Sequence, residues 1–519
     1  MLPHRRCRSR AAAQAAVVFF ALGAAPGDRP PLAFEVTHTA DVRPGSISAR
    51  VYIMLEPAGR GGEPRHGLDW FQPQPFFAVE ARDWKAGEPL HVGADAVGFP
   101  GPLDRLKPGD YAAQAVVRLN PDTHALGDGE GNAFGPVVRA TLDPKAGGTI
   151  RLTVDRLVPP KPFEETDRIK LVDIPSPILS AFHRRPIRHR AAVILPEGGG
   201  GTRRATLYIV PGFGGDHHLA GRMASSRRSG FGEDLIRVVL DPDCGTGHHV
   251  FADSAANGPR GRALVEELIP YLEAHYPARA EPGARLLNGQ SSGGWSVLWL
   301  QVTYPDSFGG VWATSPDPVD FRDFQRVDLY ARGANLFRDP SGSRRPLARR
   351  GTRPVLFFDD FSRMEDVFGD GGQLHSFEAV FSPLRSDGRP RPLWDRATGA
   401  IDPEVAHAWR AYDIRLILER DWATLGPKLA GKLRVITGDL DTFFLDGAVR
   451  LLKQSLTNLG SDAVVEVVPG KDHSTLIDAE LAARFDREMK AALGVRDAPA
   501  PRRDRDTEAR GLYDHQISR

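Results

Sequence analysis

The sequence has very little cysteine. Its 519 residues contain two cysteines, Cys7 and Cys244, and we expect the first to lie in a segment that is removed from the mature protein. A single remaining cysteine cannot form an internal disulfide. The fold must therefore be stabilised by the burial of apolar side chains, and the cysteine count leaves the redox compartment open.

The sequence also lacks an excess of charge of either sign. It has 67 Lys and Arg residues against 66 Asp and Glu residues, a net charge of +1, so nothing indicates a nucleic-acid partner. Long apolar runs are missing too, because the longest such stretch, residues 11–25, is too short to cross a bilayer comfortably. We expect no stable membrane insertion, and the composition leaves the oligomeric state unknown.

The N-terminus has the layout of a secretory signal. Four arginines within residues 5–10 precede the apolar stretch 11–25, which ends in the small residues Gly23, Ala24 and Ala25. This order is typical of a signal peptide, so we expect residues 1–28 to direct export, either to the periplasm or out of the cell. Pro26 is unusual directly after a cleavage site, and the alternative is a basic tail.

Residues 30–157 read as a β-sandwich-like domain. Short alternating runs separated by Gly, Pro and Asp are typical of a sandwich; they lie at 33–39, 46–55, 76–81, 111–119 and 149–154. The segment 128–132 lacks the acidic spacing of an EF-hand calcium loop. No catalytic constellation is present, so we interpret this region as a platform or a substrate-contact domain.

After a proline-rich linker at 158–162, the pattern changes to α/β. Short apolar runs alternate with helical patterns over residues 165–495, which predicts a doubly wound, mostly parallel sheet covered on both faces. Residues 318–428 interrupt the alternation with an irregular stretch rich in Arg, Asp, Phe and Pro. We expect this insertion to form a cap over the ligand crevice, and residues 496–519 to form a flexible tail.

The central motif is Gly289-Gln290-Ser291-Ser292-Gly293. It follows an apolar run and precedes a helical one, which is the order of a nucleophile elbow, where a serine on a strained turn exposes its hydroxyl. Ser291 occupies the central position and is the candidate nucleophile. The alternative is an ordinary strand-to-helix turn.

A serine nucleophile needs a base and an orienting carboxylate, here in the chain order Ser, Asp, His. Asp441 follows the apolar run 433–437, and His473 lies in the turn after the last run, 464–468. We predict Asp441 as the acid and His473 as the general base. Asp439 and Asp446 are rivals for the acid, and all three could instead cap the following helix.

The oxyanion hole requires two convergent backbone amides. We predict the amides of Ser292 and of Phe213, the latter in the glycine-rich loop 210–216. Gly214 is the second choice for the loop and, together with His375 of the insertion, a candidate substrate contact. For His375, local packing is the alternative.

Two histidine pairs, 217–218 and 248–249, lie in loops beyond strand ends, with Asp241, Asp243 and Cys244 nearby. Their spacing matches no tight zinc pattern. We therefore expect no metal and no cofactor, although some of these histidines could contact substrate.

Three segments resemble the putative esterase family of the α/β-hydrolase superfamily, which includes enterochelin esterase-like and esterase D-like enzymes. They are the elbow through Trp295, the run 304–310 (YPDSFGG), and the helix 263–270 (ALVEELIP) before the elbow strand. The resemblance covers about residues 165–317 and 430–493. It implies an α/β-hydrolase fold, a triad of Ser291, Asp441 and His473, and hydrolysis of small-molecule esters without a cofactor. The β-rich N-terminal domain and the long insertion depart from the minimal family pattern.

These observations predict a serine hydrolase that cleaves carboxylic esters through an acyl-enzyme. An acyltransferase with the same triad is one alternative. A peptidase fits less well, because the N-terminal domain is too short and irregular for a β-propeller. A non-catalytic binding protein with a hydrolase-like fold would be expected to lack part of the triad.

Overall fold

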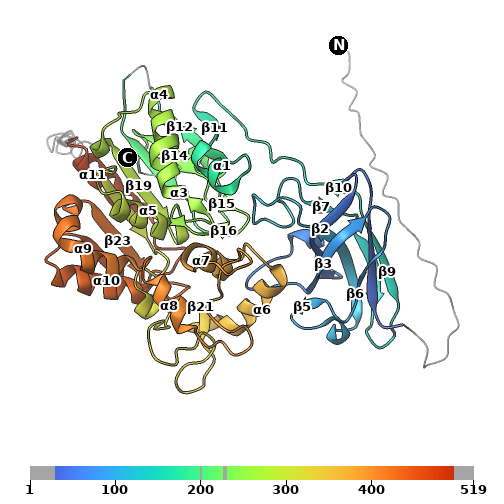
Figure 1. Ribbon diagram of the computed structural model, residues 1–519. Helices are drawn as coiled ribbons and strands as arrows, with labels where there is room; N and C mark the ends of the chain where they lie inside the picture. The colour runs from blue at the N-terminus through green and yellow to red at the C-terminus, as the bar shows by residue number, and fades with distance from the viewer. Residues whose placement is uncertain (1–29, 199–201, 226–230, 496–519) are drawn as a thin grey trace, which may run out of the picture.

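The computed structural model describes residues 30–198, 202–225 and 231–495. The predicted signal segment 1–28 and the predicted tail 496–519 lie outside the described residues. Figure 1 shows a β-rich module on one side and a layered α/β module on the other, with the α/β module's insertion below and between them. We call residues 30–157 the β-rich module.

The β-rich module consists of two sheets that enclose a core of their own. One sheet has the order β4-β1-β9 and the other has the order β10-β7-β6-β2-β3-β5, with β8 paired to β6. Alternate side chains of β2, such as Val51 and Ile53, point into the core between the sheets. The strands are β1 (Ala33–His38), β2 (Ser46–Pro57), β3 (Phe76–Lys85), β4 (Leu90–Val92), β5 (Val97–Phe99), β6 (Gly109–Val117), β7 (Ala133–Phe134), β8 (Val138–Leu142), β9 (Thr149–Val154) and β10 (Arg156–Leu157).

The α/β module is built on an eight-stranded sheet of order β11-β12-β14-β13-β19-β20-β23-β24. β12 is antiparallel to both of its neighbours, whereas the strands from β14 to β24 run parallel. The strands are β11 (Ile169–Pro175), β12 (Arg188–Ile194), β13 (Thr206–Val210), β14 (Ile236–Leu240), β19 (Arg285–Gln290), β20 (Gly310–Thr314), β23 (Leu433–Gly438) and β24 (Val464–Val468). This sheet is parallel except for β12 and has the α/β-hydrolase topology, which confirms the predicted fold class.

Helices cover both faces of this sheet, because its strands bury side chains on both sides. On one face Tyr208 and Leu287 share a core with Trp295 of α5. On the other face Leu207 and Trp312 pack with α11. The helices around the sheet are α1 (Pro177–His183), α2 (Leu219–Ser225), α3 (Arg260–Ala263), which continues through a π-helical turn into α4 (Ile269–His275), α5 (Ser292–Thr303), α10 (Asp446–Asn458) and α11 (Ala479–Ala492).

The insertion between β20 and β23 is more regular than the sequence predicted. It contains the hairpin β21 (Pro346–Arg350) and β22 (Arg353–Phe357) and the helices α6 (Phe358–Phe368), α7 (Gln373–Phe381), α8 (Pro403–Trp409) and α9 (Ile414–Leu429). In α6, buried apolar residues recur every third position from Phe358 to Val367, but the intervening Asp, Arg and Glu residues obscure this helical signal in the sequence. α9 packs against α5 and α10, so it belongs to the helical layer as well as to the insertion.

The β-rich module is joined to the insertion by hydrogen bonds as well as by packing. The Tyr52 hydroxyl donates to the Phe368 carbonyl (2.6 Å), and Arg50 donates to the carbonyls of Asp366 (2.9 Å) and Val367 (3.1 Å). The β2 side chains Tyr52 and Met54, which face away from the module's own core, belong to the same buried cluster as the core of the α/β module. The two modules therefore share a continuous interior.

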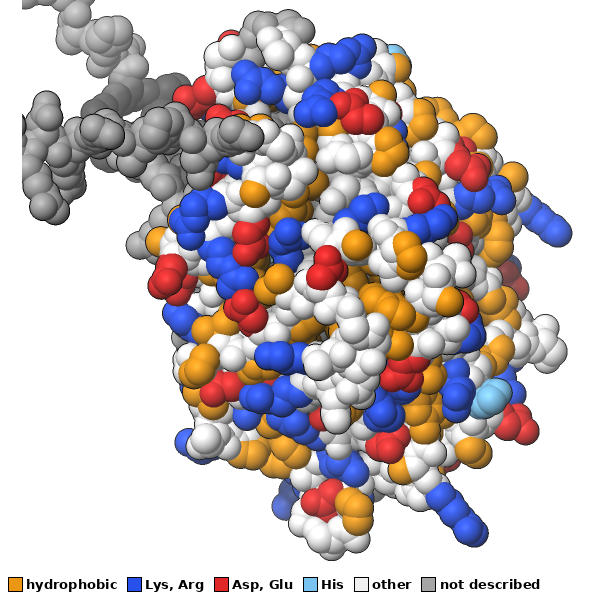
Figure 2. Space-filling view, turned by 90° about the vertical axis from the view of Figure 1, so that its left-hand side faces the viewer, with side chains coloured by type: hydrophobic (Ala, Val, Ile, Leu, Met, Phe, Trp, Pro, Cys, Tyr) orange, Lys and Arg blue, Asp and Glu red, His pale blue; other side chains and the backbone are white. Residues whose placement is uncertain are grey.

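The surface agrees with the balanced charge of the sequence. Figure 2 shows acidic and basic side chains interspersed over one face, with hydrophobic side chains between them. Among the helices of the described ranges, none is both long and apolar enough to cross a membrane.

Candidate active site

The motif around Ser291 forms the turn between β19 and α5. Ser291 has φ 61° and ψ −127°, a conformation that costs energy for a residue with a side chain and that recurs at functional sites. The close packing of this turn explains its glycines. A Cβ on Gly289 would lie 2.3 Å from the Gly293 carbonyl oxygen, and one on Gly293 would lie 2.0 Å from the Val210 carbonyl oxygen. The sequence therefore places a strained, accessible serine at the carboxyl end of the sheet.

The structure brings His473 and Asp441 together beyond the next strand ends. His473 lies in the loop after β24, and its Nδ1 is 2.8 Å from Oδ2 of Asp441. Asp441 is fully buried, and its Oδ1 accepts a hydrogen bond from the Phe443 amide (2.9 Å). With Nδ1 held by the carboxylate, Nε2 is the nitrogen left to act in the cavity that His473 shares with Ser291.

A further hydrogen bond ties the histidine loop to the elbow. The side-chain amide of Gln290 donates to the His473 carbonyl (2.5 Å). Phe443 packs edge-on against the imidazole, with ring centroids 5.1 Å apart. Both contacts limit the positions that the imidazole can take.

The electrostatics around His473 favour its charged form. Burial lowers the pKa of His473, but the hydrogen bond and charge of Asp441, with Asp317 farther away, outweigh burial and raise it overall. A positively charged imidazole is the species that forms when a serine gives up its proton. The groups around His473 therefore favour the imidazolium that a general base would form.

The two rival carboxylates have other partners. Asp446 is the first residue of α10 and is paired with Arg326 (2.9 Å) and Arg349 (3.2 Å). Asp439 accepts a hydrogen bond from the Gly470 amide (2.7 Å). Only Asp441 of the three hydrogen-bonds to His473 in the described structure.

The two predicted oxyanion amides lie on either side of Ser291. Ser292 is the first residue of α5, and Phe213 follows Gly212, whose added Cβ would lie 3.3 Å from the Ser291 Cβ. Among the described residues, neither amide donates a backbone hydrogen bond, so both remain candidate donors. The N-terminus of α5 adds its positive dipole at the same place.

Buried His248 is hydrogen-bonded to the loop that contains Phe213. Its Nδ1 accepts a hydrogen bond from the Val250 amide (3.1 Å), so Nε2 carries the proton and donates to the Pro211 carbonyl (2.9 Å). Burial lowers the pKa of His248 to about 4, which keeps the ring neutral and this hydrogen bond intact near neutral pH. One of the histidines of the two predicted pairs thus serves as a structural support.

The site cavity has a volume of about 340 Å³ and walls from three parts of the chain. The α/β module supplies Ser291, His473 and Phe213, and the insertion supplies Phe361 and Phe377. Trp70 of the β-rich module forms another part of the wall, with its ring centroid 5.1 Å from that of Phe361 and 5.6 Å from that of Phe213. Sequence reasoning missed Trp70, because no local pattern marks a loop residue that reaches another module.

Asp317 is the second site residue that the sequence did not reveal. It lies just beyond β20, its amide donates to the Ser291 carbonyl (3.2 Å), and its Oδ2 accepts from the Ser292 hydroxyl (2.5 Å). Gln373 of α7 donates to the same oxygen (3.3 Å). Burial raises the pKa of Asp317 to about 6. Its position after a strand, like that of Asp441, was the only signal that could have marked it.

The two predicted substrate contacts lie away from this cavity. Gly214 lines a second cavity on the other side of its loop. His375 is held by the Gly369 carbonyl (2.8 Å) and Asp366 (3.5 Å), the local packing that was its alternative. Its neighbours Gln373 and Leu374 line the active-site cavity instead, because they start α7 on the side that faces Ser291.

The sheet topology and the elbow give the α/β module an α/β-hydrolase fold. A family model described as putative esterase matches residues 251–426, so the resemblance predicted from the sequence is confirmed, and the match supports a hydrolase that acts on esters. The matched span includes Ser291 but ends before Asp441 and His473. No curated protein matches the chain.

Solved structures of several hydrolases are similar to the chain at low identity. An S-formylglutathione hydrolase from Agrobacterium tumefaciens is 14% identical, with 63% of this chain and 94% of that chain covered and a TM-score of 0.37. A fluorophosphonate-binding serine hydrolase of Staphylococcus aureus is 16% identical, with coverage of 63% and 98% and a TM-score of 0.37. For dipeptidyl peptidase 4 of Porphyromonas gingivalis the identity is 11%, the coverage is 81% and 46%, and the TM-score is 0.34.

Proposed function

We propose that this protein is a serine hydrolase that cleaves carboxylic esters through an acyl-enzyme, with Ser291 as nucleophile, His473 as base and Asp441 as orienting acid. One observation carries the proposal. The strained Ser291 shares a cavity with His473, whose Nδ1 is hydrogen-bonded to a fully buried carboxylate. A structural turn would need neither the strain nor the buried ion pair beside it.

In this mechanism Nε2 of His473 accepts the Ser291 proton as Oγ attacks the ester carbonyl. The amides of Phe213 and Ser292 bind the resulting oxyanion. The imidazolium then gives its proton to the departing alcohol, which leaves the acyl group on Ser291. Water, activated by the same histidine, attacks the acyl-enzyme and releases the carboxylic acid and the free serine.

The test is covalent labelling with a fluorophosphonate probe, which reacts with activated serines, followed by peptide mapping. We expect label on Ser291, no label in Ser291→Ala, and full label in a control, Ser48→Ala, an exposed serine of β2 that does not line the site cavity. Absence of label on correctly folded wild-type protein would overturn the proposal and favour a binding protein. A second assay is the release of p-nitrophenol from p-nitrophenyl acetate. Turnover that is lost in Ser291→Ala would show that the protein hydrolyses an ester and that Ser291 does more than react with the probe.

We also propose that the chain is exported, on the basis of the basic, apolar and small-residue order in residues 1–28, which are outside the described structure. N-terminal sequencing of protein recovered outside the cytoplasm should begin near residue 26–30. Recovery of an intact N-terminus only from the cytoplasm would contradict export.

A further inference from the structure

A second cavity, of about 680 Å³, lies between the β-rich module and the α/β module. It is bordered by the segment 120–130 of the β-rich module, by residues 160, 161 and 163 at the linker, and by the loops that follow β13 and β14. The loop after β13 separates it from the active site: Gly212 and Phe213 line the active-site cavity, whereas Gly214 and Gly215 line this one. A ligand in the second cavity would therefore contact the far side of the predicted oxyanion loop.

The walls of this cavity favour a cation. Its lining includes seven carboxylates, four Lys or Arg side chains and five histidines. Part of the negative charge is already balanced, since Asp122 is paired with Arg185 (2.6 Å) and Asp128 lies 3.0 Å from Nδ1 of His66. The kinds of side chain still favour a metal cation, because imidazole and carboxylate are ligands for divalent transition metals.

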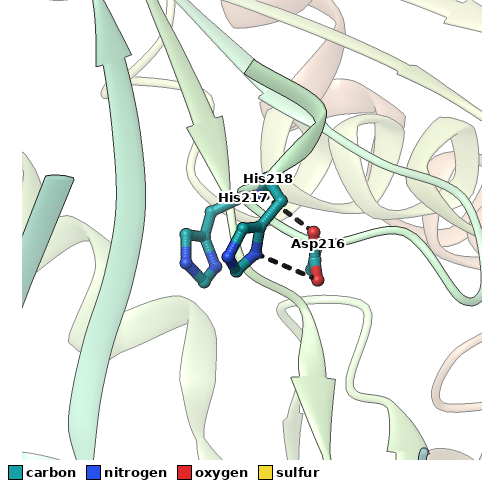
Figure 3. Close-up of side chains that lie close together, drawn as sticks. All are labelled: Asp216, His217 and His218. Carbon is teal, nitrogen blue, oxygen red and sulfur yellow. Dashed lines mark hydrogen bonds and ion pairs between the residues drawn. The ribbon is translucent and has the colours of Figure 1, made fainter. Parts of the chain in front are cut away.

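Three consecutive residues of the lining have potential metal-ligand atoms close to one another. Asp216, His217 and His218 each offer one ligand atom, and these atoms lie within 4.8 Å of one another. Figure 3 shows the two rings side by side, with the Asp216 carboxylate next to His218. Oδ2 of Asp216 is 3.3 Å from Nδ1 of His218, which is about the separation of two ligands that share a tetrahedral zinc ion at 2.0–2.2 Å.

Each of the two histidines has a ring nitrogen that is available to a metal ion. Nδ1 of His217 is 2.9 Å from Oδ2 of Asp241, which leaves Nε2 as the ring nitrogen available to a metal; this carboxylate–histidine arrangement is typical of metal ligands. The ring nitrogens of His218 are buried without a well-formed hydrogen bond among the described residues.

One basic side chain competes for the same carboxylate. Nζ of Lys161 lies 3.6 Å from Oδ2 of Asp216, but the Lys161 side chain is 62% exposed and can turn into solvent when a cation binds. Phe163 stacks on His217 with centroids 5.7 Å apart, which holds the ring in place. Ion pairing and stacking explain part of the cluster, since Nδ1 of His218 faces Asp216, but Nε2 of His218 is buried without a hydrogen bond among the described residues.

We propose that Asp216, His217 and His218 bind one divalent transition metal ion of the zinc class, with water completing its coordination. The site is distinct from the Ser291 cavity and takes no part in the ester reaction. Because it directly follows Phe213 and Gly214, the bound ion would brace the loop that carries the predicted oxyanion amide. The proposal does not depend on the esterase function.

The test is titration of chelator-treated, untagged protein with Co²⁺, followed by absorption in the visible range, and with Zn²⁺, followed by calorimetry. We expect one tightly bound ion and visible cobalt bands of a site with nitrogen and oxygen ligands. Asp241→Asn, which removes the support of His217, should weaken binding about 10–100-fold. His91→Ala, an exposed histidine of the β-rich module, is the control and should bind as the wild type does.

The ligand variants are His218→Ala and Asp216→Asn. Each should lose the one-ion binding and the rise in melting temperature that Zn²⁺ gives the wild type by mass action. Asp216→Asn keeps the shape of the side chain and should fold, so a loss of binding in this variant reports on the missing charge. Absence of stoichiometric binding to the wild type, or wild-type affinity in both ligand variants, would overturn the proposal.

Discussion

At the scale of single residues, the site combines two buried carboxylates with different tasks. Asp441 is hydrogen-bonded to the imidazole, whereas Asp317 accepts from the Ser292 hydroxyl and acts on His473 only through its charge. Burial raises the pKa of Asp317 to about 6, so it is ionised mainly above that pH. Asp317 is thus a positioning residue whose charge adds to that of Asp441 in raising the pKa of His473.

Asp317→Asn should shift the pH dependence of ester hydrolysis. The base must be neutral to accept a proton, so kcat/KM falls as the pH drops through the pKa of free His473. An ionised Asp317 raises that pKa, and its removal lowers it. The acid limb of the profile should therefore move to lower pH. Asp306→Asn, an exposed carboxylate paired with Lys428, should leave the profile unchanged, and an unshifted limb in Asp317→Asn would contradict the argument.

Gly293→Ala should destabilise the protein and abolish labelling of Ser291. The new methyl group would lie 2.0 Å from the backbone oxygen of Val210. Because backbone atoms on both sides of this contact cannot move without strain, the free energy of unfolding in urea should fall by at least about 1–3 kcal/mol. The matched control is Gly221→Ala in α2, where an added Cβ meets nothing within 4 Å. That change should be neutral or slightly stabilising. Similar behaviour of the two variants would refute the packing explanation of the elbow.

At the scale of elements, the cavity depends on loops and helices that come from separate modules. The loop before β3 contributes Trp70, α6 contributes Phe361, and the loop after β23 contributes Phe443, which also packs on His473. Much of the cavity lining is therefore aromatic. Such a wall favours an apolar group on the substrate.

Trp70→Ala should weaken the binding of esters with bulky apolar groups more than that of acetyl esters. Loss of a large apolar contact is worth about 1.5–3 kcal/mol, so KM for a bulky ester should rise about 10–100-fold with a smaller change in kcat. Steady-state kinetics on p-nitrophenyl acetate and on a longer or aromatic ester would measure the difference. Phe182→Ala, an exposed aromatic of α1, is the control. An equal loss on both esters would mean that Trp70 supports the fold and does not select the substrate.

At the scale of the whole molecule, the two modules are joined by a common interior. Tyr52 and Met54 of β2 lie in the same buried cluster as the core of the α/β module, while the opposite face of β2 packs inside the β-rich module. If either module unfolded alone, apolar side chains of the other module would be exposed to water. We therefore expect a single cooperative transition in calorimetry.

Tyr52→Phe tests this connection. The change removes the hydrogen bond from the hydroxyl to the Phe368 carbonyl (2.6 Å) and should cost about 0.5–1.5 kcal/mol, which lowers the melting temperature without splitting the transition. Tyr271→Phe, where the ring stacks on His275 at the end of α4, should melt as the wild type does. A separate early transition in Tyr52→Phe would show that the β-rich module unfolds on its own.

The sequence by itself was sufficient for features that depend on local backbone geometry. The elbow is encoded within a few residues, because glycines flank a serine between a strand and a helix. The alternation of strands and helices also predicted the sheet and the positions of Asp441 and His473 after its strands, since parallel strands end at one edge. Short helices such as α6 were missed, because their apolar spacing is interrupted by charged residues.

Only the tertiary structure decided which distant residues share a cavity. Trp70 reaches Phe361, almost three hundred positions away, because the β-rich module packs on the insertion, and no local pattern records that packing. The same reason hid Asp317 beside the elbow and brought Asp241 to His217 at the second cavity. Secondary structure follows from neighbours in the chain, whereas these contacts follow from how whole layers bury their faces against one another.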